Sequence, residues 1–267
     1  MNFLLYLRWS VSPEILHFGN VSVRWYGLLF ALTFIVGYEI LAYIFRRENV
    51  DVKKLDVLTI YIVLGTVIGA RLGHCLFYSP SYYLSNPIEI IKIWEGGLAS
   101  HGGAIGIIFA IWLFVRRNRS FSMLWILDRL VIVVALGGLF IRTGNFFNSE
   151  IYGLPSTAPW AVIFTAIDEI PRHPTQLYEG LVYFCIFLLL FSIYKTKGFN
   201  NFKSGFIFGL FFILTFTARF LIEFVKEVQS SFESGMVLDM GQILSIPFIL
   251  IGIYFVCRPA RKNIGKS

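Results

Sequence analysis

The stretch RWYGLLFALTFIVGYEILAYIFRR, residues 24–47, decides the class of fold. It contains about 20 predominantly apolar residues, enough for a helix to cross a hydrocarbon core about 30 Å thick. Similar runs recur along the chain, separated by short polar stretches. We expect spans at residues 23–45, 57–78, 98–115, 123–141, 177–194, 205–225 and 238–257. The sequence therefore predicts an all-α polytopic integral membrane protein of about seven transmembrane helices.

The composition agrees with this class. Of the 267 residues, 57% are hydrophobic and only 15% are charged, against about 25% charged in soluble domains. The net charge of +7 does not indicate nucleic-acid binding, because the basic residues are dispersed into loops. The three cysteines lie inside apolar runs without metal-binding or redox spacing, so we expect no metal and no cofactor. The first 15 residues lack a basic region and a small-residue cleavage site, which predicts no cleaved signal peptide.

The basic residues predict the orientation of the chain. Loops on the cytoplasmic side of a membrane carry an excess of Lys and Arg. The loops after the first, third and fifth spans and the C-terminal tail together hold 14 basic residues, against a handful in the alternate loops. These are Arg46, Arg47, Lys53, Lys54, Arg116, Arg117, Arg119, Lys195, Lys197, Lys203, Arg258, Arg261, Lys262 and Lys266. We therefore expect the N-terminus outside and the C-terminus in the cytoplasm.

The domain organisation is expected to be simple. No internal repeat or low-complexity linker divides residues 1–267, which predicts a single transmembrane domain. The two longest outer loops, residues 79–97 and 142–176, are rich in Pro, Ser, Asn and aromatic residues. We expect these loops to form a small extracytoplasmic cap.

Polar residues gather at the predicted outward ends of the spans. A charge at bilayer depth costs about 2.5–3.5 kcal/mol on insertion scales, so such residues usually line a cavity. The alternative is anchoring in the lipid headgroups, as Trp and Tyr often do. That alternative remains open for Arg24 and Trp25, but Arg71 and Arg219 lie about two turns inside their spans. The pattern predicts one polar layer toward the outside.

The segment GGLFIRTGNFFNSEIYG, residues 137–153, is the most specific in the chain. Glycines let a backbone approach a ligand, Arg142 can hold a phosphate by two hydrogen bonds, and Asn145 and Asn148 can orient oxygens. Glu150 could orient the arginine or accept a proton. The structural alternative is a helix C-cap followed by a polar loop.

Two further motifs carry candidate residues. In HGGAIG, 101–106, His101 could remove a proton from a thiol or hydroxyl, although a lone histidine at a membrane edge is often structural. In RFLIE, 219–223, Arg219 and Glu223 are four residues apart and can pair on one helix face. We favour a structural ion pair for Glu223, with Arg219 also available to a phosphate.

The remaining polar motifs are interpreted as structural. RHPTQLYE, 172–179, indicates the entry into the fifth span, with His173 able to approach a site. Asp128 and Arg129, on the predicted cytoplasmic side, are expected to stabilise the fold.

Together these motifs resemble the prolipoprotein diacylglyceryl transferase family over nearly the whole chain. The resemblance rests on seven blocks in order: RWYGL at 24–28, GARLGHCLFY at 69–78, WEGGLASHGGAIG at 94–106, RTGNFFNSEIYG at 142–153, RHPTQLYE at 172–179, RFLIEF at 219–224 and MGQILSIP at 240–247. It implies seven spans with the N-terminus outside. It also implies transfer of the diacylglyceryl group of phosphatidylglycerol to a lipobox cysteine thiol, which forms a thioether and releases glycerol 1-phosphate.

The resemblance also implies site residues, carried over by motif position. They are Tyr26, His101, Arg142, Asn145, Glu150, Arg219 and Glu223, with Gly153 closing the signature. Two departures stand out: Thr215 occupies a position where many members have Tyr, and the loop between the fourth and fifth spans is shorter than in some relatives.

The resulting hypothesis divides these residues by role. Arg142 and Arg219 hold the phosphate with Asn145 and Asn148, His101 is the base for the thiol, and Tyr26 lines the cavity. Glu150 orients an arginine.

The expected partners are phosphatidylglycerol, other membrane lipid and a prolipoprotein signal peptide with its lipobox cysteine. The expected location is the bacterial cytoplasmic (inner) membrane, crossed several times, with the active site toward the extracytoplasmic side. The main rival is a transporter or channel for an anionic solute, which predicts polar residues across the midplane and two related halves. An intramembrane protease lacks its nucleophile motif here, and a seven-span receptor rests on span number alone.

Overall fold

The computed structural model describes residues 6–18, 21–93, 96–198, 202–228 and 235–259. The chain forms two compact units. The first comprises residues 1–39 and 127–267, and the second comprises residues 40–126. Each unit is described below by itself.

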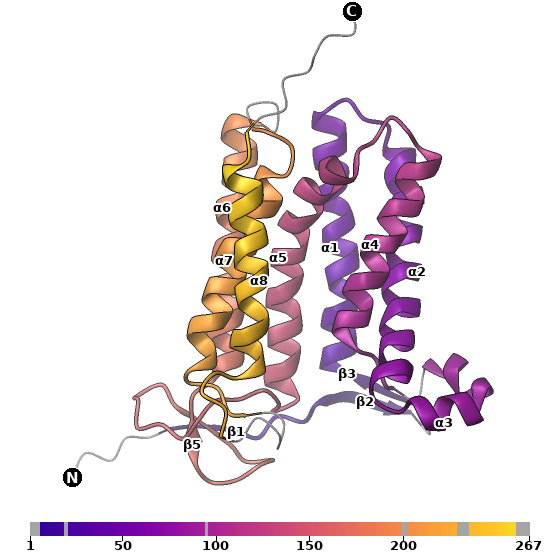
Figure 1. Cartoon of the computed structure of the whole chain (residues 1–267). Helices are drawn as coiled ribbons and strands as arrows, with labels where there is room; N and C mark the ends of the chain where they lie inside the picture. Colours follow the sequence, from indigo (N-terminus) through magenta and orange to yellow (C-terminus); the bar gives the residue numbers. More distant parts are fainter. Residues whose placement is uncertain (1–5, 19–20, 94–95, 199–201, 229–234, 260–267) are drawn as a thin grey trace, which may run out of the picture. The chain divides into compact units, whose positions relative to one another are not determined.

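Helices make up most of both units (Figure 1). Their bounds are α1 Trp25–Arg47, α2 Val52–Phe77, α3 Pro80–Ser85, the short 3-10 helix η1 Pro87–Ile91, α4 Ser100–Arg117, α5 Met123–Phe147, α6 Thr175–Lys197, α7 Phe206–Glu223 and α8 Met240–Cys257. Within the described residues, six helices are long and apolar enough to cross a membrane: α1, α2, α5, α6, α7 and α8. The all-α polytopic class is thereby confirmed.

Helix α4 is the predicted span that does not meet this criterion. It has 18 residues, and polar residues take up both of its ends: Ser100 and His101 at the start, Arg116 and Arg117 at the finish. The total of seven crossings therefore stays a prediction, as does the orientation of the termini.

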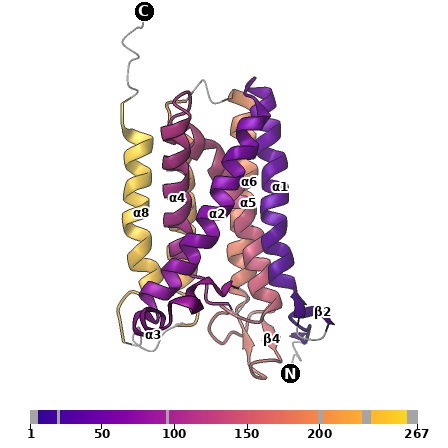
Figure 2. The same ribbon diagram turned by 90° about the vertical axis from the view of Figure 1, so that its right-hand side faces the viewer.

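In the second unit, α4 packs closely along α2 (Figure 2). Glycines on both helices allow this approach, as small residues do between membrane helices. A Cβ on Gly106 would lie 2.0 Å from the carbonyl oxygen of Gly65, and one on Gly69 would lie 2.4 Å from that of Gly102. At the far end of α4, Arg117 donates a hydrogen bond to the Tyr61 hydroxyl at 2.8 Å. Helix α4 thus follows α2 over its whole length.

In the first unit, glycines again set the helix spacing. A Cβ on Gly209 of α7 would lie 2.8 Å from the carbonyl oxygen of Gly252 in α8. Asp128 of α5 caps the start of α7, because its carboxylate accepts hydrogen bonds from the backbone N–H groups of Gly205 at 2.6 Å and Phe208 at 2.9 Å. The predicted fold-stabilising role of Asp128 is confirmed, since a buried carboxylate needs such partners.

Short strands, which the sequence analysis did not predict, lie outside the helices. β1 (Leu7–Trp9) pairs in parallel with β4 (Val162–Phe164), and β4 pairs in antiparallel with β5 (Pro171–Arg172). β2 (Glu14–Phe18) and β3 (Val21–Arg24) form a separate two-stranded sheet. A small core fixes the first sheet against the end of α5: Phe146, Val162 and Phe164 are buried, with Trp9 and Tyr152 packed against them.

The N-terminal segment therefore joins part of the loop 142–176 in one sheet. The predictions of a single domain and of an extracytoplasmic cap built by residues 79–97 and 142–176 remain predictions.

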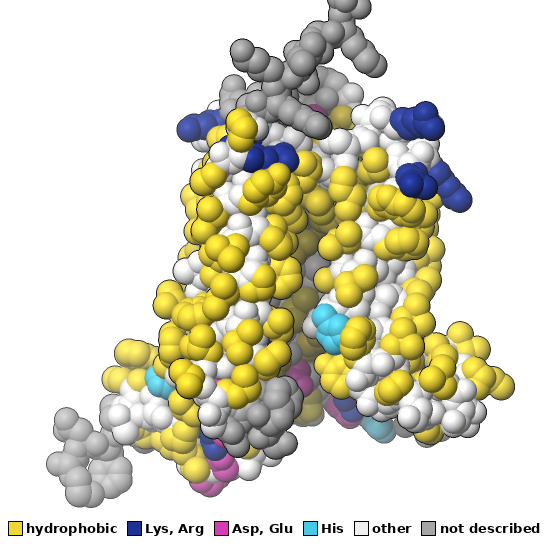
Figure 3. Space-filling model, viewed as in Figure 1, with side chains coloured by type: hydrophobic (Ala, Val, Ile, Leu, Met, Phe, Trp, Pro, Cys, Tyr) yellow, Lys and Arg dark blue, Asp and Glu magenta, His cyan; other side chains and the backbone are white. Residues whose placement is uncertain are grey.

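Charged side chains gather at helix ends, whereas hydrophobic side chains cover the visible lengths of the helices (Figure 3). In the second unit, Lys54 donates a hydrogen bond to the Asn118 side chain at 3.1 Å, which joins the first two predicted basic loops. In the first unit, Lys203 bonds the carbonyl oxygen of Arg258, and Arg258 bonds that of Ser204. Basic loops predicted to share a side thus meet within each unit.

Candidate active site

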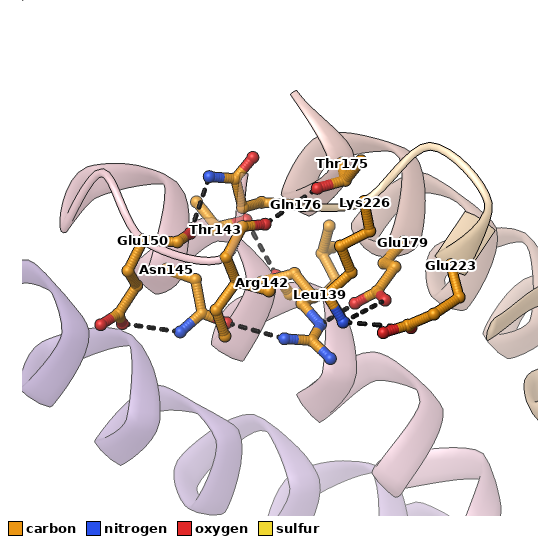
Figure 4. A network of polar contacts seen from close by, with 11 residues as sticks. Leu139, Arg142, Thr143, Asn145, Glu150, Thr175, Gln176, Glu179, Glu223 and Lys226 are labelled. Carbon is orange, nitrogen blue, oxygen red and sulfur yellow. Dashed lines mark hydrogen bonds and ion pairs between the residues drawn. The ribbon is translucent and has the colours of Figure 1, made fainter. Parts of the chain in front are cut away.

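The candidate site lies where helix ends meet in the first unit. Helix α5 ends there, α6 begins, and α7 ends, because successive helices run in opposite directions. Figure 4 shows the result: side chains from α5 and the loop after it, from the start of α6, and from the end of α7 and the segment after it form one connected polar network. The predicted polar layer at these helix ends is therefore present in this unit.

Arg142 is the centre of the network. Its side chain is only 12% exposed, and its Nε forms an ion pair with the carboxylate of Glu179, which is 1% exposed. Its Nη1 donates a hydrogen bond to the Asn145 side-chain oxygen at 3.1 Å. Two different nitrogens of the guanidinium are therefore held in fixed directions, as its rigid fork allows.

Glu150 is connected to Arg142 through Asn145. The Asn145 amide donates to Glu150 Oε1 at 2.8 Å, and the Asn148 amide donates to the same oxygen at 3.1 Å. Asn145 is buried, whereas Glu150 is exposed. The structure thus brings together the four residues predicted from the motif at 137–153. Glu150 contacts the amide that Arg142 also contacts, and its predicted role of orienting the arginine stays a prediction.

The backbone around Glu150 is strained. Ser149 has a φ of 52° and Ile151 a φ of 59°, which is an outlier for a β-branched residue. Helix α6 holds this conformation, because Gln176 donates to the Glu150 carbonyl oxygen at 2.7 Å and Thr175 donates to that of Ile151 at 2.8 Å. Such strain occurs at functional sites where the surroundings enforce it. The segment is more than the helix C-cap and polar loop that the sequence left open.

Gly153 allows three segments to meet. A Cβ at this position would lie 2.4 Å from the Val225 carbonyl oxygen and 2.7 Å from both His173 and Thr175. Its backbone N–H donates to the His173 carbonyl oxygen at 2.8 Å. The observed role of Gly153 is close packing, and its predicted role in substrate binding stays a prediction.

Glu223 has a different partner from the one expected. The four-residue spacing predicted a pair with Arg219, but the Glu223 carboxylate accepts a hydrogen bond from Lys226 Nζ at 3.2 Å. The same ammonium lies 3.9 Å from Glu179. Lys226 follows the end of α7, where the chain leaves the helical path and its side chain turns back toward both buried carboxylates.

Arg219 is consequently free of the predicted pair. It is partly exposed, and no described residue forms a hydrogen bond or an ion pair with it. Its charge acts on Tyr183, as does that of Arg142. The two arginines therefore differ: Arg142 is fixed by protein groups, whereas Arg219 has hydrogen-bond donors available to an anion.

Tyr26 belongs to the same unit and packs against α5. A Cβ on Gly144 would lie 2.8 Å from the Tyr26 ring, so a glycine is required there. The phenol lies within the electrostatic reach of Glu150 and Arg142. Its predicted role of lining the site stays a prediction.

His101 lies in the second unit, in the first turn of α4. Its side chain is exposed. Its ring makes an edge contact with Phe77, with centroids 5.3 Å apart, and a tilted contact with Tyr78 at 5.9 Å. The last turn of α2 therefore sets the position of the imidazole.

Comparison with known proteins identifies the family of this chain. The family model described as prolipoprotein diacylglyceryl transferase matches residues 13–258. The phosphatidylglycerol–prolipoprotein diacylglyceryl transferase of Tolumonas auensis is 50% identical over 257 residues, covering 96% of this chain and 99% of that protein. The chain belongs to this family. It is accordingly a membrane-embedded transferase, and the resemblance found in the sequence is confirmed.

Two further transferases of the family show similar agreement. The one from Chloroherpeton thalassium is 43% identical, with 96% of both chains covered, and the one from Bacteroides fragilis is 42% identical, with 99% of both covered. The match is continuous across all the blocks on which the resemblance rested. The transporter alternative is not supported by the family.

Sequence reasoning missed three buried members of the transferase network: Gln176, Glu179 and Lys226. Their exposed fractions are 0%, 1% and 5%. Gln176 and Glu179 belong to the motif RHPTQLYE, which was interpreted as structural, and Lys226 was not among the candidate residues. The sequence did contain a signal for Glu179, because it lies at the start of an apolar run and a charge at that depth requires a partner. Nothing in the sequence indicated which cation would supply it.

Thr215 is the position at which the resemblance implied a departure from the family pattern. Its hydroxyl is buried, and no described residue forms a hydrogen bond with it. The described residues also contain no group of three or more His, Cys, Asp or Glu side chains suited to a metal. The absence of a metal and of a cofactor stays a prediction.

A second set of charges fixes the loop beyond the membrane-spanning helices. Arg172, 7% exposed, bonds Asp168 at 2.7 Å and Glu227 at 2.6 Å. The hydrogen bond from Arg172 holds the pKa of the Asp168 carboxyl below its ordinary value of 3.8. These pairs join the loop 142–176 to the segment after α7.

Proposed function

We propose that this protein transfers the diacylglyceryl group of phosphatidylglycerol to the thiol of the lipobox cysteine in a prolipoprotein signal peptide. A thioether forms and glycerol 1-phosphate leaves. The observation that carries the proposal is the Arg142 network together with Arg219, with which no described residue forms an ion pair, in a chain of the transferase family.

The reaction exchanges one bond for another at a glyceryl carbon. The substrate thiolate attacks this carbon, a carbon–sulfur bond forms, and the carbon–oxygen bond to the phosphate breaks with its electron pair passing to the phosphate oxygen. The nucleophile is the cysteine of the prolipoprotein. Its thiol must first lose a proton, because thiolates and not thiols react. His101 is the proposed acceptor of the thiol proton, in keeping with its exposed imidazole.

The arginines are proposed to hold the phosphate, where negative charge grows as the bond breaks. Fixed cations act best on charge that develops in the transition state, since they need no reorganisation. Arg142 meets this requirement through its bonds to Asn145 and Glu179. Arg219 supplies donors that no described protein group uses, and the Asn148 amide completes the proposed anion site.

The proposed location is the bacterial cytoplasmic membrane, with the site facing the extracytoplasmic side. Two features support this: the basic loops predicted to be cytoplasmic meet one another within each unit, and the Arg142 network lies at the ends of the helices that point away from the basic loops of its own unit.

Incubation of the purified protein with phosphatidylglycerol and a lipobox peptide tests the proposal. Mass spectrometry should find the peptide heavier by one diacylglyceryl group, with glycerol 1-phosphate released in equal amount. A Cys→Ser lipobox peptide is the control and should stay unmodified. Absence of thioether from folded, lipid-supplied protein would refute the proposed reaction.

The role of His101 needs a separate test. His101→Gln should lower kcat, because Gln cannot accept the proton. An unchanged kcat would exclude His101 as the base.

A further inference from the structure

Arg71 is a buried arginine of the second unit that the proposed mechanism leaves without a role. It lies near the end of α2 and is 4% exposed. No carboxylate among the described residues forms an ion pair with it; the nearby Glu89 side chain is paired with Lys92 instead. A buried guanidinium needs hydrogen-bond acceptors to compensate for its lost hydration.

Backbone carbonyl groups supply these acceptors. Arg71 Nε donates to the Ile90 carbonyl oxygen at 2.8 Å and Nη2 donates to that of Glu89 at 2.6 Å. Its Nη1 donates to the carbonyl oxygens of Gly96 at 2.5 Å and Gly97 at 3.2 Å. The single side chain thus joins η1 to the turn that precedes α4.

The turn at Gly96 and Gly97 depends on glycine. Both residues have positive φ angles, 90° and 71°, which other residues rarely adopt. A Cβ on Gly97 would lie 2.6 Å from the His74 ring and 2.9 Å from Arg71 Nη1. The carbonyl groups can therefore point at the guanidinium only while the turn lies directly against α2.

From this turn the chain leads to His101 within four residues. The Ala99 N–H donates to the Ala70 carbonyl oxygen at 2.9 Å, which fixes the entry into α4. The imidazole of His101 then rests against Phe77 and Tyr78, at the end of α2. Its position is set by α2 on one side and by the turn that Arg71 holds on the other.

We infer that Arg71 is a positioning residue for His101, acting through the Gly96–Gly97 turn. This inference rests on the proposed function of His101 as the base. Arg71 touches neither substrate in this scheme; it fixes the start of α4 from which the imidazole projects.

Arg71→Lys tests the inference, because an ammonium is a point charge and cannot reach acceptors in the four directions that the fork serves. We expect kcat to fall at least tenfold while KM for phosphatidylglycerol changes less than twofold. In ¹³C-histidine-labelled protein, the His101 imidazole resonance, assigned by its loss in His101→Gln, should shift. If Arg71→Lys does not fold, Gly97→Ala is the second variant. Its methyl group would clash with the His74 ring and Arg71 Nη1, so kcat should fall and the His101 resonance should shift in the same way.

The matched control is Arg116→Lys. Arg116 lies at the other end of α4, exposed and stacked over the Trp112 ring at 4.2 Å, and its replacement should change neither kcat nor the His101 resonance. A lowered kcat with an unmoved His101 resonance would overturn the positioning role, as would an unchanged kcat. The proposed base role fails separately if His101→Gln keeps wild-type turnover, whatever Arg71→Lys does.

Discussion

Replacing Arg142 by lysine removes the fork and keeps the charge. Arg142 uses Nε for Glu179 and Nη1 for Asn145. A lysine ammonium is a single point on a flexible stem and cannot occupy both positions at once. The variant should retain the ion pair with Glu179, because that carboxylate is 1% exposed and costly to leave unpaired. The bond to Asn145 should be lost.

The size of the effect follows from that one bond. A hydrogen bond to a charged group contributes about 1.5–3 kcal/mol. If that hydrogen bond is what holds the cation in place for the phosphate, its loss raises the activation free energy by the same amount. At about 1.4 kcal/mol for each factor of ten, kcat/KM should fall about 10- to 150-fold. Arg142→Ala should fall much further, because it also leaves Glu179 without its cation.

The assay is the rate of thioether formation with phosphatidylglycerol and a lipobox peptide, corrected for folded protein. Arg8→Lys is the matched control: Arg8 pairs with Glu169 on the surface with 57% of its side chain exposed, so turnover should stay within twofold. Near-normal turnover in Arg142→Lys would refute the idea that two directed contacts matter, and would leave charge alone as the requirement.

Three further changes test the packing and the charges. Gly106→Ala should destabilise the second unit by about 1–3 kcal/mol through overpacking, since its Cβ would lie 2.0 Å from the Gly65 carbonyl oxygen. The control Gly27→Ala, whose Cβ would have nothing within 4 Å, should be tolerated. Equal melting temperatures of the two variants in detergent would argue against close helix packing. Lys226→Gln should lower the free energy of unfolding by about 3–5 kcal/mol, because it leaves the buried Glu223 carboxylate without its cation, although Glu179 keeps Arg142, and a melting temperature equal to wild type would disprove this. The lowered pKa of Asp168 stabilises the folded loop at pH values above the ordinary pKa of 3.8. This contribution should be lost as pH falls below about 4, so hydrogen exchange in residues 162–172 should rise there, and Asp168→Asn should abolish the pH step.

The membrane class and the site motif follow from sequence because both are local in the chain. An apolar run of about 20 residues has few alternatives to a membrane helix. Arg142, Asn145 and Asn148 lie at spacings of three residues at the end of one such run, which places them on one face. Glu150 then follows within reach, so this half of the network needed no tertiary information.

The partners of charged residues were decided by the tertiary structure. On a helix, Arg219 and Glu223 have a spacing suited to pairing, yet Glu223 bonds Lys226, which lies beyond the helix end. The choice depends on how the chain turns after α7 and on the presence of Glu179 from another helix beside the same ammonium. The spacing of residues along the sequence reveals neither the turn after α7 nor the position of Glu179.

The sequence by itself thus determined that this protein lies in a membrane, that its helices alternate in direction and which family it resembles. Only the tertiary structure decided that Glu179 fixes Arg142, that no described residue uses the donors of Arg219, and that the N-terminal strand β1 pairs with β4. The physical reason is the separation in sequence of the groups that interact. Hydrophobic burial is read from consecutive residues, whereas a buried charge takes whichever opposite charge the fold brings within about 4 Å.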